Sequence, residues 1–234
     1  MAADNFIDVP FSLTNLDRYI ARTAIFNALR NSLYQLDGEL LDIGCGKMPY
    51  KGYILNNSSV TTYTGLDIED ALTYDSAVKP DFFWEGTKMP FQDLSFTTAL
   101  ATEVLEHCPD PSVVIAETYR VLKKEGVLFF TVPFLWPLHE VPHDEFRYTP
   151  FSLERLLKNA GFQHVELHAT GGWHASMAQM LGLWVRRSPL SSRKRAVLSR
   201  LLRPAIGYLV SKDQENISFT EGQMITGLYG IARK

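Results

Sequence analysis

The 234 residues are enough for one large domain with a central sheet covered on both faces. Apolar residues make up 46% of the chain and charged residues 21%, which excludes a disordered or fibrous protein. Two cysteines, Cys45 and Cys108, are too few for a disulfide framework or a zinc site, and we expect no metal centre. The first residues lack the basic and apolar regions of a signal peptide, and no apolar run reaches the roughly 18 residues of a spanning helix. We therefore expect a cytoplasmic protein.

Periodic apolar residues and turn signals predict helices that alternate with strands along the chain. Asn15 opens the first predicted helix. Asp110 and Pro111 open the second as a cap and a first-turn proline, and Gly126 is expected to close it. Gly161 is expected to end the third. The predicted helices cover 15–36, 110–126 and 151–162, and the predicted strands cover 39–44, 61–70, 80–84, 96–102, 127–132, 164–170 and 224–234.

This alternation predicts an α/β fold with a mainly parallel, doubly wound sheet. We expect a single domain over residues 1–234. It consists of an N-terminal helical segment (1–36), a core (37–170), a basic helical insert (173–212) and a final strand (224–234). In such sheets a ligand binds beyond the carboxyl ends of the strands. The candidate functional residues are therefore those that directly follow each strand.

The stretch ELLDIGCGKMPY (39–50) ends a buried strand with an aspartate and two glycines. It lacks the Gly-Lys-Ser/Thr of a phosphate loop, and Pro49 stands where a dinucleotide fingerprint needs its third glycine. A plain tight turn would also explain the glycines, but Asp42 would repel a pyrophosphate. The next strand ends in Asp67, where a carboxylate can accept both ribose hydroxyls, and the third ends before Glu85. Three acids at three successive strand ends favour a positively charged nucleoside without phosphate.

Four motifs occur in the order and at the spacing of class I S-adenosylmethionine-dependent methyltransferases, a family that residues 37–170 resemble. The motifs are ELLDIGCGKMPY, GLDIED, EGTKMPFQDLSFTTALATEVLEH and YRVLKKEGVLFFTVP. A further stretch, HEVPHDEFRYTPFSLERLLKNAGF, is similar to a subgroup of cell-surface glycan and polysaccharide pathways. The resemblance implies a Rossmann-like sheet of seven strands with an antiparallel last strand. It also implies S-adenosylmethionine as the cofactor.

The resemblance assigns cofactor-binding roles to residues at four strand ends. The turn of Asp42, Gly44, Cys45 and Gly46 would surround the amino-acid end of the cofactor, and Cys45 would be a small loop residue rather than a nucleophile. Asp67 would hold the ribose hydroxyls, and Ile68 would lie against the adenine. The remaining assignments are Glu85 and Gly86 near the adenine edge, where the family more often has aspartate, and Thr102 and Glu103 on the methionine side.

The segment HEVPHDEFRYT (139–149) holds the candidates for a general base, which an acceptor hydroxyl would require. His143, next to Asp144, is the preferred candidate because histidine titrates near neutral pH. His139 and Tyr148 are alternatives, and all three side chains could instead have structural roles. His107 is expected to pack under the cofactor loop. Trp173 and His174 follow the sixth predicted strand and are candidates for acceptor contacts, although Trp173 could equally belong to the core.

Residues 173–212 carry eight Lys and Arg side chains and no acid, a charge of +8. The net charge is -3, so the rest of the chain carries -3 minus 8, or -11. Two helices are expected here. Their basic side chains are either merely solvated or form a surface that meets an anionic membrane or a phosphate-bearing acceptor. Nucleic acid is disfavoured because the remainder is acidic. The acceptor is expected to be a small molecule or a glycan hydroxyl, with a quinone or lipid ring, or a catalytically inactive cofactor-binding protein, as the alternatives.

Overall fold

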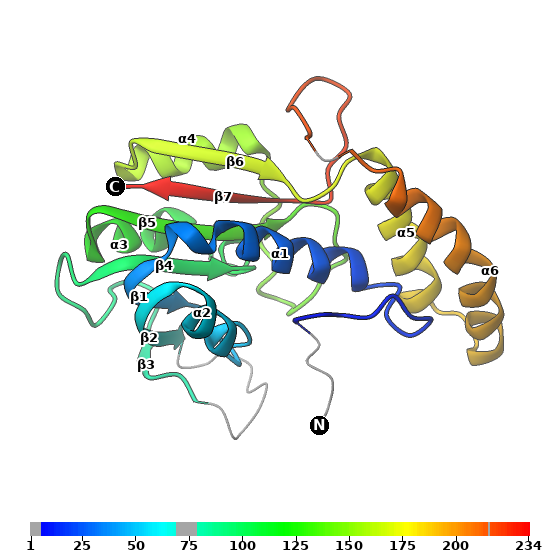
Figure 1. Cartoon of the computed structure of the whole chain (residues 1–234), viewed down its shortest axis with the longest axis horizontal. Coiled ribbons are helices and arrows are strands. Elements are labelled where there is room, and N and C mark those ends of the chain that lie inside the picture. The colour runs from blue at the N-terminus through cyan, green and yellow to red at the C-terminus, as the bar shows by residue number, and fades with distance from the viewer. Residues whose placement is uncertain (1–5, 69–78, 215) are drawn as a thin grey trace. The chain divides into compact units, whose positions relative to one another are not determined.

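A computed structural model describes residues 6–68, 79–214 and 216–234 of the chain, shown in Figure 1. It divides into two compact units. The sheet unit comprises Leu29–Pro133, Leu138–Leu167 and Tyr229–Lys234, and the helical unit comprises Met1–Ala28, Phe134–Pro137 and His168–Leu228. The prediction of a single domain stays a prediction.

Seven strands form one sheet in the order β3-β2-β1-β4-β5-β7-β6. The strands β1 to β5 pair in parallel. The last strand, β7, runs antiparallel to β5. The Lys234 amide donates to the Gly126 carbonyl and the Phe134 amide donates to the Thr226 carbonyl, so residue numbers rise along one strand as they fall along the other. In Figure 1 the arrow of β7 points opposite to that of β6. The strands are β1 (Asp37–Ile43), β2 (Ser59–Ile68), β3 (Phe82–Trp84), β4 (Phe96–Thr102), β5 (Leu122–Pro133), β6 (His164–Ala169) and β7 (Gly227–Arg233). The predicted seven-stranded α/β fold is therefore confirmed.

Local capping chemistry explains where two helices of the sheet unit begin and end. Asp110 accepts a hydrogen bond from the Ser112 amide at the start of α3 (Pro111–Val121). Thr149 caps α4 (Pro150–Ala160) in the same way, and Gly161 ends it with a left-handed φ of 113°. The other helices are α1 (Tyr19–Ser32), α2 (Lys51–Asn57), α5 (Trp173–Arg187) and α6 (Ser192–Ser211), with short 3-10 turns η1 (Leu33–Gln35) and η2 (Leu105–His107).

The predicted role of Gly126 as the end of α3 is wrong. The helix ends at Val121, and Leu122 already has extended backbone angles, so residues 122–126 begin β5. Gly126 lies inside this strand. The position favours glycine because a Cβ atom there would come within 2.8 Å of the Lys123 carbonyl oxygen. The sequence interpretation also missed α2, a helix of seven residues with a single buried side chain, Ile54.

Helices α5 and α6 confirm the expected pair of helices in the basic insert. Within the helical unit they pack on Leu16 and Ile20 through small and branched side chains. Gly182 allows this packing, since a Cβ atom at this position would lie 2.0 Å from the Leu16 carbonyl oxygen. Among the described residues, no helix is long and apolar enough to cross a membrane.

Candidate functional site

The loop after β1 takes a shape that requires glycine at two positions. Gly44 and Gly46 have positive φ angles of 62° and 48°. The loop is tied to β2 twice: the Cys45 amide donates to the Leu66 carbonyl at 3.1 Å, and the Gly46 amide donates to Oδ2 of Asp67 at 2.8 Å. The predicted glycine turn and the predicted ribose acid are thus parts of one hydrogen-bonded structure.

Asp67 lies at the end of β2, and most of its surface is buried. Its second oxygen, Oδ1, accepts a bond from the Ile68 amide at 2.9 Å. Burial raises the pKa of the Asp67 carboxyl, although the two backbone amides favour the ionised form and oppose the rise. A carboxylate has about four acceptor positions, so two bonded amides leave positions for the hydroxyls of a ligand.

Asp42 lies beneath the same loop in a nearly dry environment. β1 is flanked by β2 and β4, and Asp42 faces Gly65 on one side and Leu100 on the other. Its carboxyl accepts a hydrogen bond from the Tyr63 hydroxyl at 2.6 Å. Burial raises the pKa of Asp42 to about 7, the charge of Asp67 adds to the rise, and the Tyr63 bond opposes it. A cation nearby would favour the ionised form of this group.

Cys45 has the properties of a loop residue. It is buried, and burial together with the charges of Asp42 and Asp67 raises the pKa of its thiol. The thiol therefore stays protonated near neutral pH, and a protonated thiol is a poor nucleophile. This agrees with the expectation that Cys45 shapes the turn.

The third and fourth strand ends differ in how tightly their side chains are held. Glu85 is exposed, accepts a bond from the Thr87 hydroxyl at 2.7 Å, and precedes Gly86, which has a φ of 85°. Thr102 ends β4 opposite Thr131. Glu103 has an unusual φ of 56° for a residue with a side chain, and the Thr131 hydroxyl donates to its carboxylate at 2.9 Å.

The segment with the candidate bases is fastened to η2. The amides of Glu145 and Phe146 both donate to the Glu106 carbonyl. Nδ1 of His107 lies 2.9 Å from the His143 carbonyl oxygen. The Tyr148 hydroxyl donates to the Leu105 carbonyl at 2.7 Å. Residues 138–149 therefore hold a defined position beyond the ends of β4 and β5.

The three candidate bases lie in different surroundings. The His143 ring is exposed, and its carbonyl rather than its ring orients His107. His139 is half-buried, and burial and the nearby His107 lower its pKa. Tyr148 is buried, and burial raises the pKa of its hydroxyl. The hydrogen bond from the Tyr148 hydroxyl to the Leu105 carbonyl supports the alternative that this side chain anchors the loop. The catalytic role of all three residues stays a prediction.

Asp144 organises this loop through charge. Its carboxylate accepts two bonds from Arg147, at 2.7 and 2.8 Å, and one from the His139 amide at 3.1 Å. Burial alone would raise its pKa, but these bonds outweigh burial and lower the pKa of Asp144 to about 2. The side chain next to the predicted base therefore pairs with Arg147 and His139.

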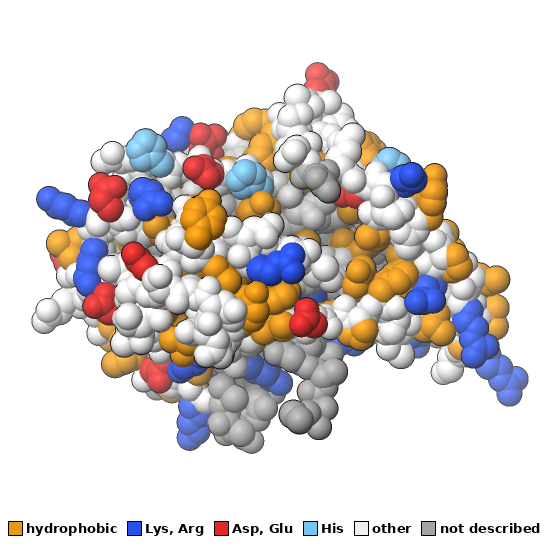
Figure 2. Space-filling view, viewed as in Figure 1, with side chains coloured by type: hydrophobic (Ala, Val, Ile, Leu, Met, Phe, Trp, Pro, Cys, Tyr) orange, Lys and Arg blue, Asp and Glu red, His pale blue; other side chains and the backbone are white. Residues whose placement is uncertain are grey.

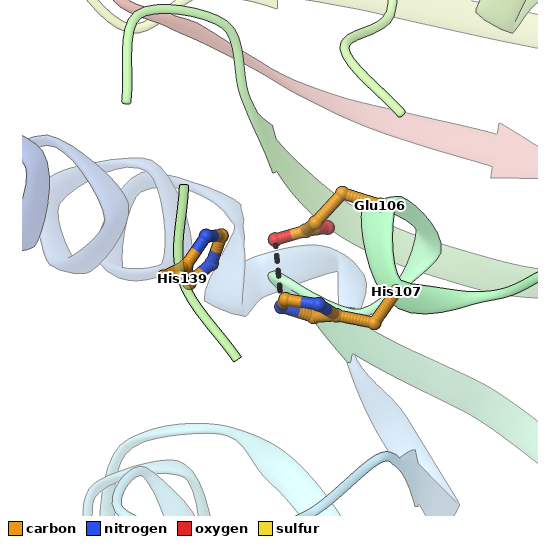
Figure 3. Close-up of side chains that lie close together, drawn as sticks. All are labelled: Glu106, His107 and His139. Carbon is orange, nitrogen blue, oxygen red and sulfur yellow. Dashed lines mark ion pairs between the residues drawn. The ribbon is translucent and has the colours of Figure 1, made fainter. Parts of the chain in front are cut away.

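Glu106 is a residue of this site that the sequence interpretation missed. Its side chain is fully buried, and neither carboxylate oxygen has a hydrogen-bond partner within the described part of the chain. Glu106, His107 and His139 each offer one ligand atom, and these atoms lie within 4.8 Å of one another (Figure 3). The EVLEH stretch contained the signal, since it places a glutamate and a histidine together just beyond a strand end.

Trp173 and His174 belong to the helical unit, at the start of α5. Both side chains are exposed, and the Trp173 indole donates to the Gly222 carbonyl at 3.0 Å. Trp173 is therefore not a core residue, and its predicted acceptor contact stays a prediction.

Residues 41–130 match the family described as a methyltransferase domain. A ubiquinone biosynthesis O-methyltransferase of Pseudomonas putida is 30% identical over 105 residues, which cover 40% of this chain and 43% of the relative. The chain therefore matches less than half the length of this curated relative. A crystal structure of the cyclase SpnF shares 20% identity and a TM-score of 0.56, covering 92% of this chain and 82% of that one. An S-adenosylmethionine-dependent methyltransferase from Archaeoglobus fulgidus shares 15% identity and a TM-score of 0.54, with coverages of 92% and 94%. At these identities the structures show a shared fold.

The buried carboxyl of Asp42 predicts a specific dependence of stability on pH. Its folded pKa, about 7, exceeds the usual 3.8, so its contribution to stability is complete below pH about 4 and is lost as the pH rises towards 7. The loss amounts to roughly 4 kcal/mol at most. In urea titrations between pH 4 and 7.5, Asp42→Asn should remove this decline. The matched control is Asp37→Asn at the exposed start of the same strand. A native-like pH dependence in Asp42→Asn would contradict the burial argument.

Proposed function

We propose that the chain is an S-adenosylmethionine-dependent methyltransferase that acts on a hydroxyl group of a small molecule or glycan. The observation that carries the proposal is the bond between Asp67 and the Gly46 amide, which joins a glycine turn to an acid at the adjacent strand end. The match of residues 41–130 to a methyltransferase domain supports the same function. As a pathway we propose the synthesis of a cell-surface polysaccharide, on the resemblance of residues 139–162.

The residues of the first two strand ends fit this cofactor chemically. A sulfonium and an ammonium group carry positive charge, and Asp42 and Asp67 supply negative charge in a largely dry environment. The amides of Cys45 and Gly46 are already used inside the protein, so the turn offers few donors to a phosphate. Asp67 would hold the ribose hydroxyls and Ile68, whose side chain is exposed, would lie against the base.

The protein's task in this reaction is to orient the acceptor and to remove a proton. When bound, S-adenosylmethionine supplies an activated methyl group. The acceptor hydroxyl must lose its proton as it attacks, and the exposed His143 ring can accept that proton at a ring nitrogen. The bonds from Glu145 and Phe146 to the Glu106 carbonyl keep the loop that carries His143 in place.

A ring hydroxyl of a quinone or another lipid is the second candidate acceptor. The similarity to a ubiquinone biosynthesis O-methyltransferase favours it, although this similarity covers 40% of the chain. Both candidates are hydroxyl acceptors. Isotope-labelled cofactor added to extracts distinguishes them, because a methylated glycan partitions into water and a methylated quinone into organic solvent. A third candidate, an inactive cofactor-binding protein, would bind the cofactor and label neither fraction.

Cofactor binding should depend on Asp67 in particular. Asp67→Asn keeps the size of the side chain but removes its charge, so the affinity for S-adenosylhomocysteine should fall at least tenfold in calorimetry. Asp37→Asn at the opposite end of the neighbouring strand should leave the affinity unchanged. NAD should bind poorly to the native protein. Tight NAD binding, or an unchanged affinity in Asp67→Asn, would overturn the cofactor assignment.

Removal of the His143 ring should affect catalysis and spare the fold. His143→Ala leaves the backbone carbonyl that orients His107, so only the ring is tested. Label transfer to the acceptor fraction should fall roughly 10²-fold, with unchanged binding of S-adenosylhomocysteine. Tyr148→Phe serves as the comparison, since it removes a buried hydrogen bond and should mainly lower the melting temperature. Full activity of His143→Ala would assign the proton transfer to another group.

A further inference from the structure

We infer that Glu106, His107 and His139 bind a divalent transition-metal ion. One ligand atom of each lies within 4.8 Å of the others, and Figure 3 shows the three side chains gathered around one point. Two come from η2 and the third from the loop after β5. This site departs from the expectation, drawn from the cysteine count, that the chain has no metal centre.

The buried carboxylate of Glu106 is the observation that calls for a cation. The side chain has no exposed surface, and both oxygens lack a hydrogen-bond partner among the described residues. Buried carboxylates are normally hydrogen-bonded, paired with a cation or bound to a metal, because burial without compensation is unfavourable. The nearest cationic candidate, Nε2 of His107, lies 3.7 Å from Oε1, which is longer than a hydrogen bond. A metal ion between the two atoms would satisfy both.

The spacing agrees with a shared ion. Ligand atoms about 2.0–2.1 Å from a tetrahedral zinc ion lie roughly 3.4 Å from each other. Nε2 of His107 lies 3.7 Å from Oε1 of Glu106 and equally far from Oε2 of Glu140. A shift of a few tenths of an ångström would bring the Glu106 and His107 atoms to ligand spacing.

His107 has a second contact that orients its ring as in metal sites, and the His139 ring lies beside a carboxylate. Nδ1 of His107 lies 2.9 Å from the His143 carbonyl oxygen, so a proton on Nδ1 leaves Nε2 free to bind a metal. Nδ1 of His139 lies 3.3 Å from Oδ2 of Asp144, and Arg147 holds this carboxylate in turn. Metal-binding histidines usually donate their other N–H to a carbonyl or a carboxylate. His107 shows this pattern, whereas Nδ1 of His139 lies near the Asp144 carboxylate without a hydrogen bond to it.

The donor set defines the class of metal. Two imidazoles and one carboxylate suit Zn²⁺, Mn²⁺, Fe²⁺ or Co²⁺, whereas Mg²⁺ prefers oxygen ligands. Three protein ligands leave a position for water or for an oxygen of the acceptor. If the proposed methyl transfer to a hydroxyl holds, an ion here would make that hydroxyl easier to deprotonate. This role rests on the proposed function, but metal binding itself does not.

The test uses the full chain after treatment with a chelator and dialysis. Calorimetry with ZnCl₂ or MnCl₂ should show one equivalent bound, and Co²⁺ should give a visible absorption spectrum that reports its ligands. Glu106→Gln and His107→Ala should each weaken binding at least tenfold. His164→Ala, which removes an exposed histidine on β6, is the matched control and should bind normally.

Three results would overturn the inference: the absence of binding, binding that both variants retain, or a preference for Mg²⁺. If Glu106→Gln fails to fold, His139→Ala tests the same site from the loop side. S-adenosylhomocysteine binding measured on the same samples separates the two proposals. If the native protein binds S-adenosylhomocysteine but no metal, the metal site alone is rejected. If it binds the metal but not S-adenosylhomocysteine, the cofactor assignment alone is rejected.

A second inference rests on a different surface: we propose that α5 and α6 dock on an anionic lipid membrane. Four large apolar side chains on α5, spaced by four, three and four residues, lie on one helical face and are each about half exposed. On α6 three more are at least half exposed. These residues are Trp173, Met177, Met180 and Trp184, and Val197, Leu201 and Tyr208. Figure 2 shows hydrophobic and basic side chains next to one another over these helices.

The charge of the two helices matches an anionic bilayer. Several of the basic side chains make contacts within the helical unit; for example, Arg187 pairs with Asp17 at 3.0 Å, and Arg203 donates to the Phe11 carbonyl. Arg193, Lys194 and Arg200 are exposed. Residues 173–212 contain no acid that could neutralise them. An exposed apolar face with basic side chains, on helices that cannot span a bilayer, is typical of helices that lie in the membrane interface.

Sedimentation with vesicles tests this surface. The native protein should sediment with phosphatidylglycerol-containing vesicles at low salt and not with phosphatidylcholine alone, and high salt should release it. The variant with Arg193→Glu, Lys194→Glu and Arg200→Glu should lose at least tenfold in binding. A charge-matched control with Arg30→Glu, Lys124→Glu and Arg155→Glu, all exposed outside these helices, should keep most of it.

The apolar face needs its own variant, Met180→Gln with Trp184→Gln. Weaker binding of this variant supports insertion of the apolar side chains into the lipid. Full binding would mean that charge attraction alone, which any polyanion could provide, accounts for the contact, and this would overturn the docking inference. Failure of the native protein to bind anionic vesicles at low salt, or equal losses in the charge-matched control, would overturn it as well.

Discussion

The hydrogen bond from the Gly46 amide to the Asp67 carboxylate is the interaction on which the geometry of the site depends. It joins the loop after β1 to the end of β2, two strands whose parallel register brings their carboxyl ends together. The left-handed angles at Gly44 and Gly46 are possible because neither residue has a side chain. One carboxylate therefore fixes the shape of the turn and keeps acceptor positions for a ligand.

Three carboxylates with little exposed surface near this edge of the sheet differ in how much hydrogen bonding the protein supplies to them. Asp144 has a bidentate arginine and a backbone amide, and its pKa is low. Asp42 has one hydroxyl donor, and its pKa rises to about 7. Glu106 has no hydrogen-bond partner among the described residues. Because a charge in a dry environment needs compensation, the less the protein supplies, the more a bound cation contributes. The first carboxylate is structural, whereas the other two are suited to ligands with positive charge.

The residues that match a known family and the residues that would choose the acceptor are different parts of the chain. The family match ends at residue 130, so it includes the glycine turn, Asp67, Glu106 and His107. The loop 138–149 and the helices α5 and α6 lie beyond it. Cofactor binding is thus the better supported half of the proposed function. The acceptor depends on segments outside this match, and the guides to it are the resemblance of residues 139–162 and the chemistry of the loop and of the basic, apolar pair of helices.

The sequence by itself determined the elements that local rules control. It predicted β4 at Phe96–Thr102, the cap at Asp110, the end of α4 at Gly161 and the acids near the ends of β1 and β2, since each depends on neighbours in the chain. It misplaced the end of α3 because Gly126 serves a close backbone contact in β5 rather than a helix end. Only the tertiary structure decided that Tyr63 bonds to Asp42 and that Glu106 is buried beside two histidines. Burial and pairing are set by segments distant in sequence, and no local pattern records how much water a side chain loses when those segments meet.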